Sequence, residues 1–329
     1  MQQKSFSKKT KAAKIQELTK SFFKDPLTAT KILKQYWNED EKLQALHDDF
    51  SENTLSNFYM PFGVAPHFLI DGKTYVIPMA IEESSVVAAA SSAAKFWKDK
   101  GGFQTEVIGT EKLGQVHFIF QGGIVPLQQY FEAVKKDLLV ATEPITEKMR
   151  TRGGGILDIQ LVDKTADLPN YYQLNASFDT KDAMGANFIN SCLEAIASRF
   201  KRPNIEIVMS ILSNYVPNCL VKASVSCPVE KMGFKNFSGD DFANRLKKAV
   251  DIANASVHRA VTHNKGIMNG VDALSLATGN DFRAIEAGIH AYAARSGKYS
   301  SLSDCTIEDG IFTFSVSLPM ALGTVGGVT

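Results

Sequence analysis

The order of apolar patterns between residues 107 and 213 restricts the fold of this chain more than any other feature. Short apolar runs indicate strands, and longer runs with apolar residues at every third or fourth position indicate helices. The patterns predict strand, helix, strand, strand, helix and strand, which is the split βαβ arrangement of a four-stranded sheet with two helices on one face. The predicted strands are 115–121, 156–162, 171–178 and 205–211, and the predicted helices are 127–150 and 183–200.

The segments on both sides of this region indicate a larger unit. Asp71-Gly72 between two apolar runs predicts a β-hairpin, and the Ala-rich segment 84–97 behind it predicts a helix that ends at Gly101-Gly102. The last third of the chain reads as strand, helix, glycine-rich loop, helix and strand. Its predicted elements are the strands 219–225 and 311–318, the helices 240–260 and 282–295, and the loop 264–270.

These patterns predict an α+β fold with two domains and an arm. We expect residues 1–50 to form an N-terminal helical arm and residues 107–213 to form a ferredoxin-like small domain. The small domain is inserted into a large mixed α/β domain of residues 51–106 and 214–329. A chain of 329 residues is long enough for two hydrophobic cores.

Charge and composition exclude several classes of protein. The 36 Lys and Arg residues nearly balance the 35 Asp and Glu residues, so there is no broad cationic field for nucleic acid. No apolar run approaches the ~20 residues of a membrane-spanning helix, and no secretory signal is present. The four cysteines are isolated from one another, which fits a reducing cytoplasm. We therefore expect a cytoplasmic protein with no membrane or nucleic-acid partner.

Several common catalytic motifs are absent from the sequence. No G-x-G-x-x-G follows a strand and no G-x-x-x-x-G-K-[ST] occurs, so a Rossmann domain and a P-loop are both disfavoured. The metalloprotease motif H-E-x-x-H and the hydrolase motif G-x-S-x-G are also missing, and we expect no metal site.

Two carboxylates, Glu82 and Glu83, stand at the start of the apolar helix pattern that runs to Ala90. Acids in a first helical turn commonly do no more than complement the helix dipole. Alternatively, a carboxylate buried beside Val and Ala side chains has a raised pKa and can transfer a proton near neutral pH. The residues alone leave both interpretations open.

Lys265 lies in the segment Thr262 to Gly270 between polar amides and two glycines, and we expect it in a loop. A loop lysine is usually a solvated charge. The neighbouring Ile267, Met268 and Val271 suggest partial burial, where an ammonium stabilises a developing oxyanion strongly.

Two further segments read as helix starts. Asn280 or Asp281 is expected to cap the helix that begins near residue 282, and capping alone would explain either residue. Asp182 is expected to cap a helix whose first turn, Ala183 to Asn187, is unusually small. Small residues and free amides there admit a phosphate, and tight packing against the sheet explains them equally well.

Taken together, these four segments resemble the 3-hydroxy-3-methylglutaryl-CoA (HMG-CoA) reductase family, specifically its bacterial class II. Residues 82–90 are similar to the catalytic-glutamate segment, residues 182–187 to the nicotinamide-cofactor motif, residues 263–270 to the catalytic-lysine segment and residues 277–281 to the catalytic-aspartate segment. The four matches occur in the family's order, and the resemblance extends from about Ser51 to Thr329.

The resemblance implies a role for each matching residue. Glu83 becomes the proton donor and acceptor, Lys265 the group that stabilises the substrate oxyanion, and Asp281 the acid that tunes both. Ser85, Asn214, Arg259 and Asn269 look like the HMG-binding positions, and Asp182, Met184, Gly185 and Asn187 look like the cofactor site.

The resemblance also implies an activity and an assembly. Family members convert HMG-CoA to mevalonate and CoA in the mevalonate (isoprenoid) pathway by two hydride transfers from NADPH or NADH. They are obligate homodimers with the active site at the subunit interface. Rival functions for this sequence are a CoA- or nucleotide-binding protein without turnover and a thioester hydrolase that uses Glu83.

Three departures from the family pattern stand out. Ser56 replaces a glycine in the segment Glu52 to Ser56, and Ser84 replaces a proline after Glu83. Relatives also carry a C-terminal flap domain with a catalytic histidine, which we expect to be absent from this chain. None of the six histidines occupies its place; they are His47, His67, His117, His258, His263 and His290.

Overall fold

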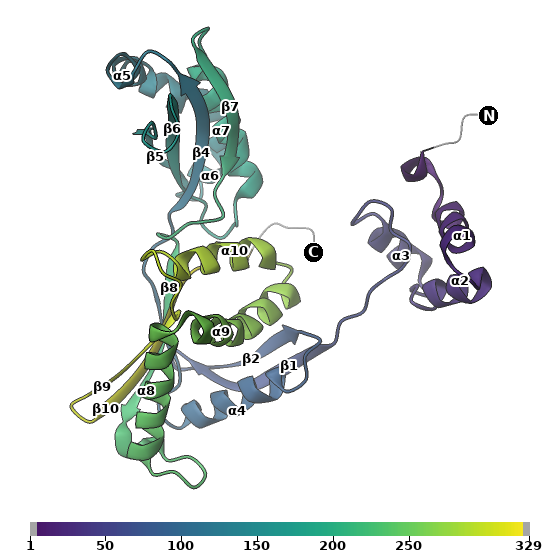
Figure 1. Ribbon diagram of the computed structural model, residues 1–329, viewed down its shortest axis with the longest axis vertical. Coiled ribbons are helices and arrows are strands. Elements are labelled where there is room, and N and C mark those ends of the chain that lie inside the picture. Colours follow the sequence, from purple (N-terminus) through teal and green to yellow (C-terminus); the bar gives the residue numbers. More distant parts are fainter. Residues whose placement is uncertain (1–4, 325–329) are drawn as a thin grey trace. The chain divides into compact units, whose positions relative to one another are not determined.

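The computed structural model describes residues 5–324, and the chain divides into two compact units, Met1–Pro61 and Phe62–Thr329 (Figure 1). Each unit is considered by itself. None of the helices in the described part of the chain is long and apolar enough to cross a membrane. The last residues, 325–329, and with them any expectation about the C-terminal flap, lie outside the described range.

Short helices make up the first unit, as the sequence predicts. Each α-helix begins behind a side-chain cap: Thr10 accepts from the amide of Ala13, Asp25 from Leu27 and Thr28, and Asp40 from Lys42 and Leu43. The elements are the 3₁₀ helix η1 (Phe6–Lys8) and the helices α1 (Lys11–Phe22), α2 (Pro26–Gln35) and α3 (Glu41–Asp48).

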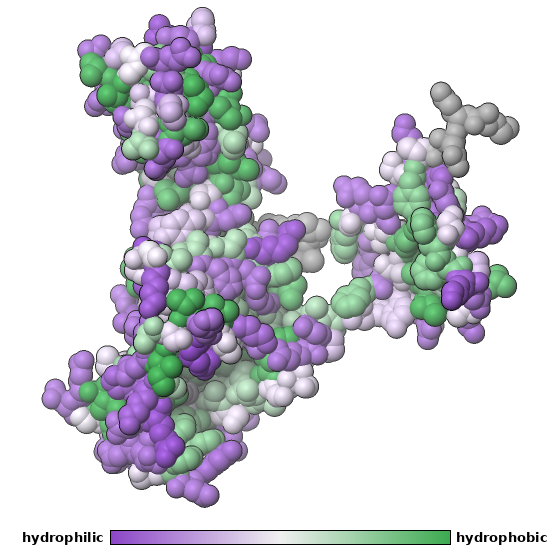
Figure 2. Space-filling view, in the orientation of Figure 1, coloured by the Kyte–Doolittle hydropathy of each residue, from purple (hydrophilic) through white to green (hydrophobic). Residues whose placement is uncertain are grey.

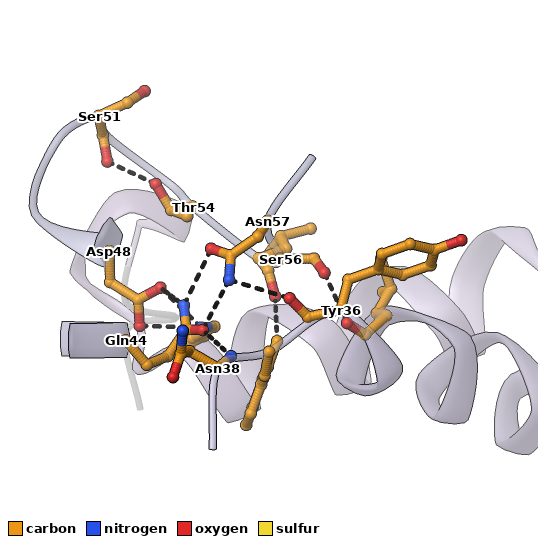
Figure 3. Close-up of polar contacts among 12 residues, drawn as sticks. Tyr36, Asn38, Gln44, Asp48, Ser51, Thr54, Ser56 and Asn57 are labelled. Atoms are coloured by element: carbon orange, nitrogen blue, oxygen red, sulfur yellow. Dashed lines mark hydrogen bonds and ion pairs between the residues drawn. The ribbon is translucent and has the colours of Figure 1, made fainter. Parts of the chain in front are cut away.

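The segment after α3 folds back onto these helices, and Gln44 is the centre of its polar contacts (Figure 3). The Asn57 amide donates to Gln44 Oε1 at 2.9 Å, and Gln44 Nε2 donates to Asp48. Ser56, which replaces the family's glycine, donates its hydroxyl to Leu33 O at 2.5 Å. The first unit therefore continues past residue 50, and the serine hydroxyl is used in its structure.

Many large apolar side chains of the first unit are exposed, and Figure 2 shows green apolar patches on its surface. Among residues 5–61, only Ile15 and Ala29 are buried apolar residues. A unit of this size buries little of its apolar surface on its own. The exposed side chains are Phe22, Phe23, Leu27, Ile32, Tyr36, Leu43, Leu46, Phe50, Phe58, Tyr59 and Met60.

The second unit opens with the predicted hairpin, in which β1 (Phe62–Ile70) pairs antiparallel with β2 (Lys73–Ala80). The turn is Asp71-Gly72, and both residues have positive φ, as this turn requires. Helix α4 (Val86–Lys98) follows and packs on β1. The chain then leaves α4 through Gly101 and Gly102, again with positive φ.

A four-stranded antiparallel sheet with the order β5-β6-β4-β7 confirms the split βαβ arrangement predicted for residues 107–213 (Figure 1). Alternate residues of β4 and β6 are buried, and they form one core with the helices on that face. The elements are β4 (Lys112–Phe120), α5 (Ile124–Ala141), α6 (Glu143–Arg150), β5 (Gly155–Asp163), β6 (Tyr171–Asp179), α7 (Ala186–Phe200) and β7 (Ile205–Leu212).

Two details of this region differ from the sequence prediction. The single helix expected over residues 127–150 is interrupted at Thr142, where Pro144 starts the second piece, because proline lacks the amide that a continuous helix needs. Helix α7 begins at Ala186, not at Ala183.

A second four-stranded sheet, with the order β3-β8-β10-β9, lies against α8 and α4 and shares a core with them. The prediction missed β3 and β9, because each is short and β3 is exposed along its whole length. The elements are β3 (Gln104–Val107), β8 (Leu220–Pro228), η2 (Val229–Met232), α8 (Gly239–Ala255), β9 (Ser303–Glu308) and β10 (Ile311–Pro319).

Helix α9 (Val257–Ala277) is the largest correction to the sequence analysis. The predicted helix 240–260 ends at Ala255, and Ser256 caps a new helix of 21 residues. The predicted loop 264–270 lies in the middle of that helix. Glycine disfavours a helix by only about 1 kcal/mol, and the buried face of α9 offsets that cost at Gly266 and Gly270. Helix α10 (Phe282–Ala293) packs against α9.

Candidate active site

Glu83 and Lys265 form an ion pair, with Lys265 Nζ donating to Glu83 Oε2 at 2.6 Å. The two residues are 182 positions apart in the sequence. Glu83 lies in the turn between β2 and α4, and Lys265 lies in the middle of α9, which packs against β2. The fold therefore joins the acid and the base that the sequence analysis selected separately.

The surroundings of this pair differ from the sequence prediction. Both side chains are exposed in the single chain, by 48% for Glu83 and 59% for Lys265. Of the two interpretations left open for Glu83, burial beside Val and Ala is not found in the single chain, and the suggested partial burial of Lys265 is wrong there, because residues 82–85 turn outward ahead of α4. A surface pair of this kind contributes little to stability, so its position needs another explanation.

Two of the expected substrate-binding residues, Ser85 and Asn269, are close in sequence to Glu83 and Lys265. Asn269 is four residues after Lys265 on α9, which places both on one face of the helix. Ser85 follows Glu83 by two residues and adopts a left-handed conformation, φ 73°, at the N-terminus of α4. Its hydroxyl makes no capping hydrogen bond, so it remains available to a ligand.

The other two lie further away. Arg259 is in the first turn of α9, where its amide donates to Ser256 Oγ. Asn214 lies in the turn that follows β7, and its carbonyl oxygen would meet a Cβ on Gly288 of α10 at 2.5 Å. The structure shows no hydrogen bond between either residue and the Glu83–Lys265 pair within the described part of the chain.

The residue before Lys265 fixes the rotation of α9. Asn264 is fully buried, and its amide donates to Ser300 O at 2.9 Å while its Oδ1 accepts from the Leu302 amide at 3.0 Å. The neighbouring His263 contacts Ser303 Oγ at 2.7 Å, and burial lowers its pKa. Lys265 faces outward because Asn264 faces inward. The sequence analysis placed Asn264 among the polar surroundings of the lysine and missed this role.

Of the two residues expected to cap α10, Asn280 and Asp281, it is Asp281 that forms the N-cap. Its Oδ1 accepts from the amides of Arg283 and Ala284 and from Arg283 Nε. It does not join the Glu83–Lys265 pair: about 12 helical residues, or roughly 18 Å of helix axis, separate Lys265 from the end of α9 before Asp281. One chain therefore keeps its three expected catalytic residues in two separate places.

A cleft of about 790 Å³ lies beside Asp281. The start of α7 forms one wall and the start of α10 forms the other. Gly323 donates its amide to Asn280 Oδ1, and Thr324 donates its amide to Asp182 O, so the last described residues connect the two walls. The lining residues are Ala183 to Phe188, Leu276, Gly279 to Arg283 and Gly323.

Three of the four expected cofactor residues, Met184, Gly185 and Asn187, line this cleft, and the fourth, Asp182, does not. Asp182 does not cap α7, because the helix begins three residues later than predicted and its N-cap is Gly185. The amides of the first turn therefore belong to Ala186, Asn187 and Phe188. Gly185 has φ 91°, and a Cβ there would lie 2.5 Å from the Thr180 side chain. Only glycine fits without shifting the loop.

A buried lysine beneath this loop was missed by the sequence analysis. Lys112, the first residue of β4, donates to Thr180 Oγ1 and, at 2.8 Å, to Ala183 O. Burial lowers its pKa. The available signal was a lysine at an inward position of the alternating strand, where an apolar residue is expected.

A second cavity, of about 880 Å³, shares Gly279, Asn280 and Gly323 with the first. Its lining is mostly apolar and comes from the β1–β2 hairpin, α9 and the segment after β10, with Phe68, Met79, Val271, Leu274 and Leu322 among the lining residues. Together the two cavities can hold a ligand with one polar and one apolar part.

Fold and site together define an α+β protein that has a split βαβ sheet, a glycine-backed cleft and a lysine–glutamate pair, without a Rossmann motif. The family model for hydroxymethylglutaryl-coenzyme A reductase matches residues 12–329. The chain therefore belongs to the hydroxymethylglutaryl-coenzyme A reductase family.

Individual relatives agree with this membership. The chain is 38% identical over 286 residues to 3-hydroxy-3-methylglutaryl-coenzyme A reductase of Archaeoglobus fulgidus, which covers 86% of this chain and 64% of the relative. It is 34% identical over 289 residues to the probable enzyme of Borreliella burgdorferi, covering 86% of this chain and 65% of that protein. The chain thus spans just under two thirds of these curated relatives.

A solved structure shows the same fold. The class II 3-hydroxy-3-methylglutaryl-CoA reductase of Streptococcus pneumoniae, bound to NADPH in open conformations, aligns with a TM-score of 0.79 and 33% identity. The alignment covers 99% of this chain and 88% of that one. The class II character expected from the sequence is thereby supported.

Proposed function

We propose that this chain catalyses the NAD(P)H-dependent interconversion of HMG-CoA with mevalonate and CoA. The observation that carries the proposal is the 2.6 Å hydrogen bond between Lys265 Nζ and Glu83 Oε2, formed by two motifs far apart in the sequence. An exposed ion pair adds little to stability. An ammonium and a carboxylate held side by side can, however, stabilise an oxyanion and then protonate it.

We assign the reaction steps to these two groups. Reduction of the thioester carbon gives a hemithioacetal, which releases CoA thiolate and leaves mevaldehyde, and reduction of mevaldehyde gives mevalonate. Each reduction places negative charge on the same substrate oxygen, where Lys265 Nζ donates a hydrogen bond. Glu83 provides the proton that neutralises this oxygen in the second step. The complete reaction consumes two hydrides and two protons for each thioester.

The cleft beside α7 fits a nicotinamide dinucleotide. Its first-turn amides at Ala186 to Phe188 can donate hydrogen bonds to a phosphate, and Gly185 leaves room for close approach of a ligand to the backbone. We propose Asp182, Met184, Gly185 and Asn187 as the binding positions for NADPH or NADH, which supplies the hydride when bound. Asp182 directly precedes Ala183 of the cleft lining, and we propose its carboxylate as the acceptor for a ligand hydroxyl.

We assign the HMG-CoA site to the region around α4 and α9, in the expected large domain of residues 51–106 and 214–329. Ser85, Asn214, Arg259 and Asn269 are proposed to hold the HMG group. Asn269 has the best support, because it shares a helix face with Lys265. Residues 107–213 are proposed as the dinucleotide-binding small domain, since α7 and its loop belong to that sheet.

We further propose that the working enzyme is a homodimer whose two copies share each active site. Within one chain, Asp281 and the dinucleotide cleft lie at one end of α9, and Lys265 with Glu83 lies roughly 18 Å of helix axis away. A second copy can place its Asp281 and cleft against the exposed pair of the first. The four cysteines are free and buried, which agrees with the cytoplasm as the place of reaction.

Cofactor oxidation tests the proposal. Purified protein is mixed with NADPH or NADH and HMG-CoA, and the nicotinamide absorbance and the free thiol are followed together. Loss of two nicotinamides for each thiol released supports the reductase. Free thiol without cofactor oxidation would instead indicate a thioester hydrolase, and ligand binding without either change would indicate a binding protein.

A further inference from the structure

Lys112 carries a buried positive charge without a carboxylate partner. It is 5% exposed, and its ammonium donates to one hydroxyl and one carbonyl, Thr180 Oγ1 and Ala183 O. Among residues 5–324, no carboxylate oxygen lies within 4.0 Å of Lys112 Nζ; the nearby Asp179 acts on Lys112 through its charge and forms its ion pair with Lys181. Two neutral acceptors do not balance a buried ammonium.

The placement of this charge connects it to the dinucleotide cleft. Both acceptors belong to the loop between β6 and α7, and Ala183 itself lines the cleft. Thr180 is also the residue that a Cβ at Gly185 would strike. Lys112 therefore holds the loop from beneath, while the first-turn amides of α7 face the cleft.

A hydrophobic residue in the same space would destabilise the fold less than this lysine does. Removing a charge from water without a counter-ion destabilises a fold, and burial accordingly lowers the Lys112 pKa. A cation kept at such a cost is expected where an anion completes the charge balance. The cleft above the loop is where the proposed ligand brings two phosphates.

We propose that Lys112 is a positioning residue of the dinucleotide site. Its ammonium fixes the turn from Thr180 to Ala183, and its charge adds to the positive potential that the pyrophosphate of the ligand experiences. The inference rests on the proposed function, since it assigns the cleft to a nucleotide diphosphate. The ligand in turn adds negative charge to that of the nearby Asp179, which forms its ion pair with Lys181.

The test compares a buried lysine beneath the loop with an exposed lysine elsewhere on the same sheet. Lys112→Met removes the buried charge, and Lys164→Met removes an exposed lysine that is paired with Asp167 after β5. Calorimetry measures the Kd of NADPH, of inorganic pyrophosphate and of HMG-CoA for the full chain. Lys112→Met is expected to weaken NADPH and pyrophosphate about tenfold or more, with HMG-CoA unchanged within about twofold. Lys164→Met is expected to change none of the three by more than about twofold.

Two further measurements separate charge from scaffolding. Because Lys112→Met removes an unpaired buried charge, the ligand-free protein should melt at an equal or higher temperature while it binds NADPH less tightly. The dependence of the NADPH Kd on salt should become shallower in the same variant. A residue with a merely structural role would lower the melting temperature and leave the salt dependence unchanged.

The outcomes are distinct. Wild-type affinity for NADPH and pyrophosphate in Lys112→Met overturns the inference, and so does an equal loss of HMG-CoA binding. If Lys112→Met does not fold, Thr180→Val keeps the charge and removes one of its two links to the loop, and a smaller loss of NADPH affinity is expected. If the wild type binds pyrophosphate through Lys112 but neither NADPH nor HMG-CoA, the proposed function fails and the anion site stands.

Discussion

The two ends of helix α9 differ in how complete they are within one chain. Near its middle, Lys265 meets Glu83 on an open surface, where both side chains are about half exposed. Beyond its C-terminal end, Asp281 borders an enclosed cleft of about 790 Å³ that is walled by two helix starts. The region around Lys265 contains the ion pair on an exposed surface. The region around Asp281 contains a cleft between two helix starts, and Lys265 is not part of it.

This difference fits the proposed homodimer. Oxyanion stabilisation by an ammonium is strong only when water is excluded, and both side chains of the open pair are exposed in one chain. The cleft beside Asp281 has Arg283 among its lining residues but not Lys265. In the proposed homodimer, the cleft of one copy covers the open pair of the other.

The largest effect is expected from removing the lysine of the open region. Lys265→Ala should lower kcat by ~10² or more, because the oxyanion loses its donor in both reductions. The fold should remain intact, since Lys265 makes only a surface ion pair. The measurement is steady-state oxidation of NADPH with HMG-CoA, with circular dichroism for the fold and Lys248→Ala on α8 as control. Near-full activity would remove Lys265 from the mechanism.

Mixing two inactive variants tests whether the regions act across copies. Lys265→Ala spoils the open region, and Asp281→Asn spoils the aspartate of the enclosed one. If each site combines one region from each copy, a mixed dimer has one intact site, and an equal mixture should regain about a quarter of the wild-type activity. The variants are unfolded and refolded together before assay. A mixture that stays inactive would mean that Lys265 and Asp281 must come from the same chain.

The regions also differ in how well the sequence predicted them. The small sheet was predicted in its full order, because its strands alternate strictly and its turns carry clear breakers. The secondary structure predicted for the segment around Lys265 was wrong. Gly266 and Gly270 locally indicate a loop, whereas the burial of Asn264 and Met268 favours a helix. That burial depends on segment 300–303, which is distant in the sequence.

The site residues show the same limit. The motifs selected Glu83 and Lys265, but only the fold brings them to 2.6 Å. Asp182 was expected to cap α7 because acids commonly do so, whereas the positive φ of Gly185 delays the helix start. No sequence motif identified Lys112 as a site residue. Its role depends on a buried contact with Thr180, which is 68 residues away.

A smaller effect, confined to the enclosed region, is expected from Gly185→Val. Its Cβ would lie 2.5 Å from Thr180 in a backbone conformation of φ 91°, so the loop must shift. We expect the KM for NADPH to rise about tenfold or more, as a displaced phosphate loop loses charge-assisted hydrogen bonds, with little change in the KM for HMG-CoA. Gly310→Val is the matched control, because Gly310 also has positive φ, 75°, with nothing within 4 Å of its Cβ position. Equal effects of Gly185→Val on both substrates would count against a dinucleotide site here.

The smallest effect concerns the contact between α9 and α10. This contact packs α10, whose start lines the cleft, against α9. Asp272 of α9 is paired with Glu286 of α10, and its Oδ1 is buried without a hydrogen-bond partner in the described structure. Burial, together with the neighbouring Glu286, raises the pKa of Asp272 from its usual 3.8 to about 7. The two carboxyl groups therefore share a proton below neutral pH.

The sign of the pH effect follows from this raised pKa. Because the folded state binds the proton more tightly than the unfolded state, Asp272 contributes stability that is fully present below about pH 4 and is lost as the pH rises through about 7. The loss should be roughly 1–2 kcal/mol after allowance for partial exposure and the shared proton. Asp272→Asn cannot ionise, so its melting temperature should change less between pH 5.5 and 8.5 than that of the wild type. Asp309→Asn, in the exposed β9–β10 turn, controls for the loss of one carboxylate. If Asp272→Asn and the wild type show the same pH dependence, the two helices are not held by a shared proton, and the enclosed region keeps its place through apolar packing alone.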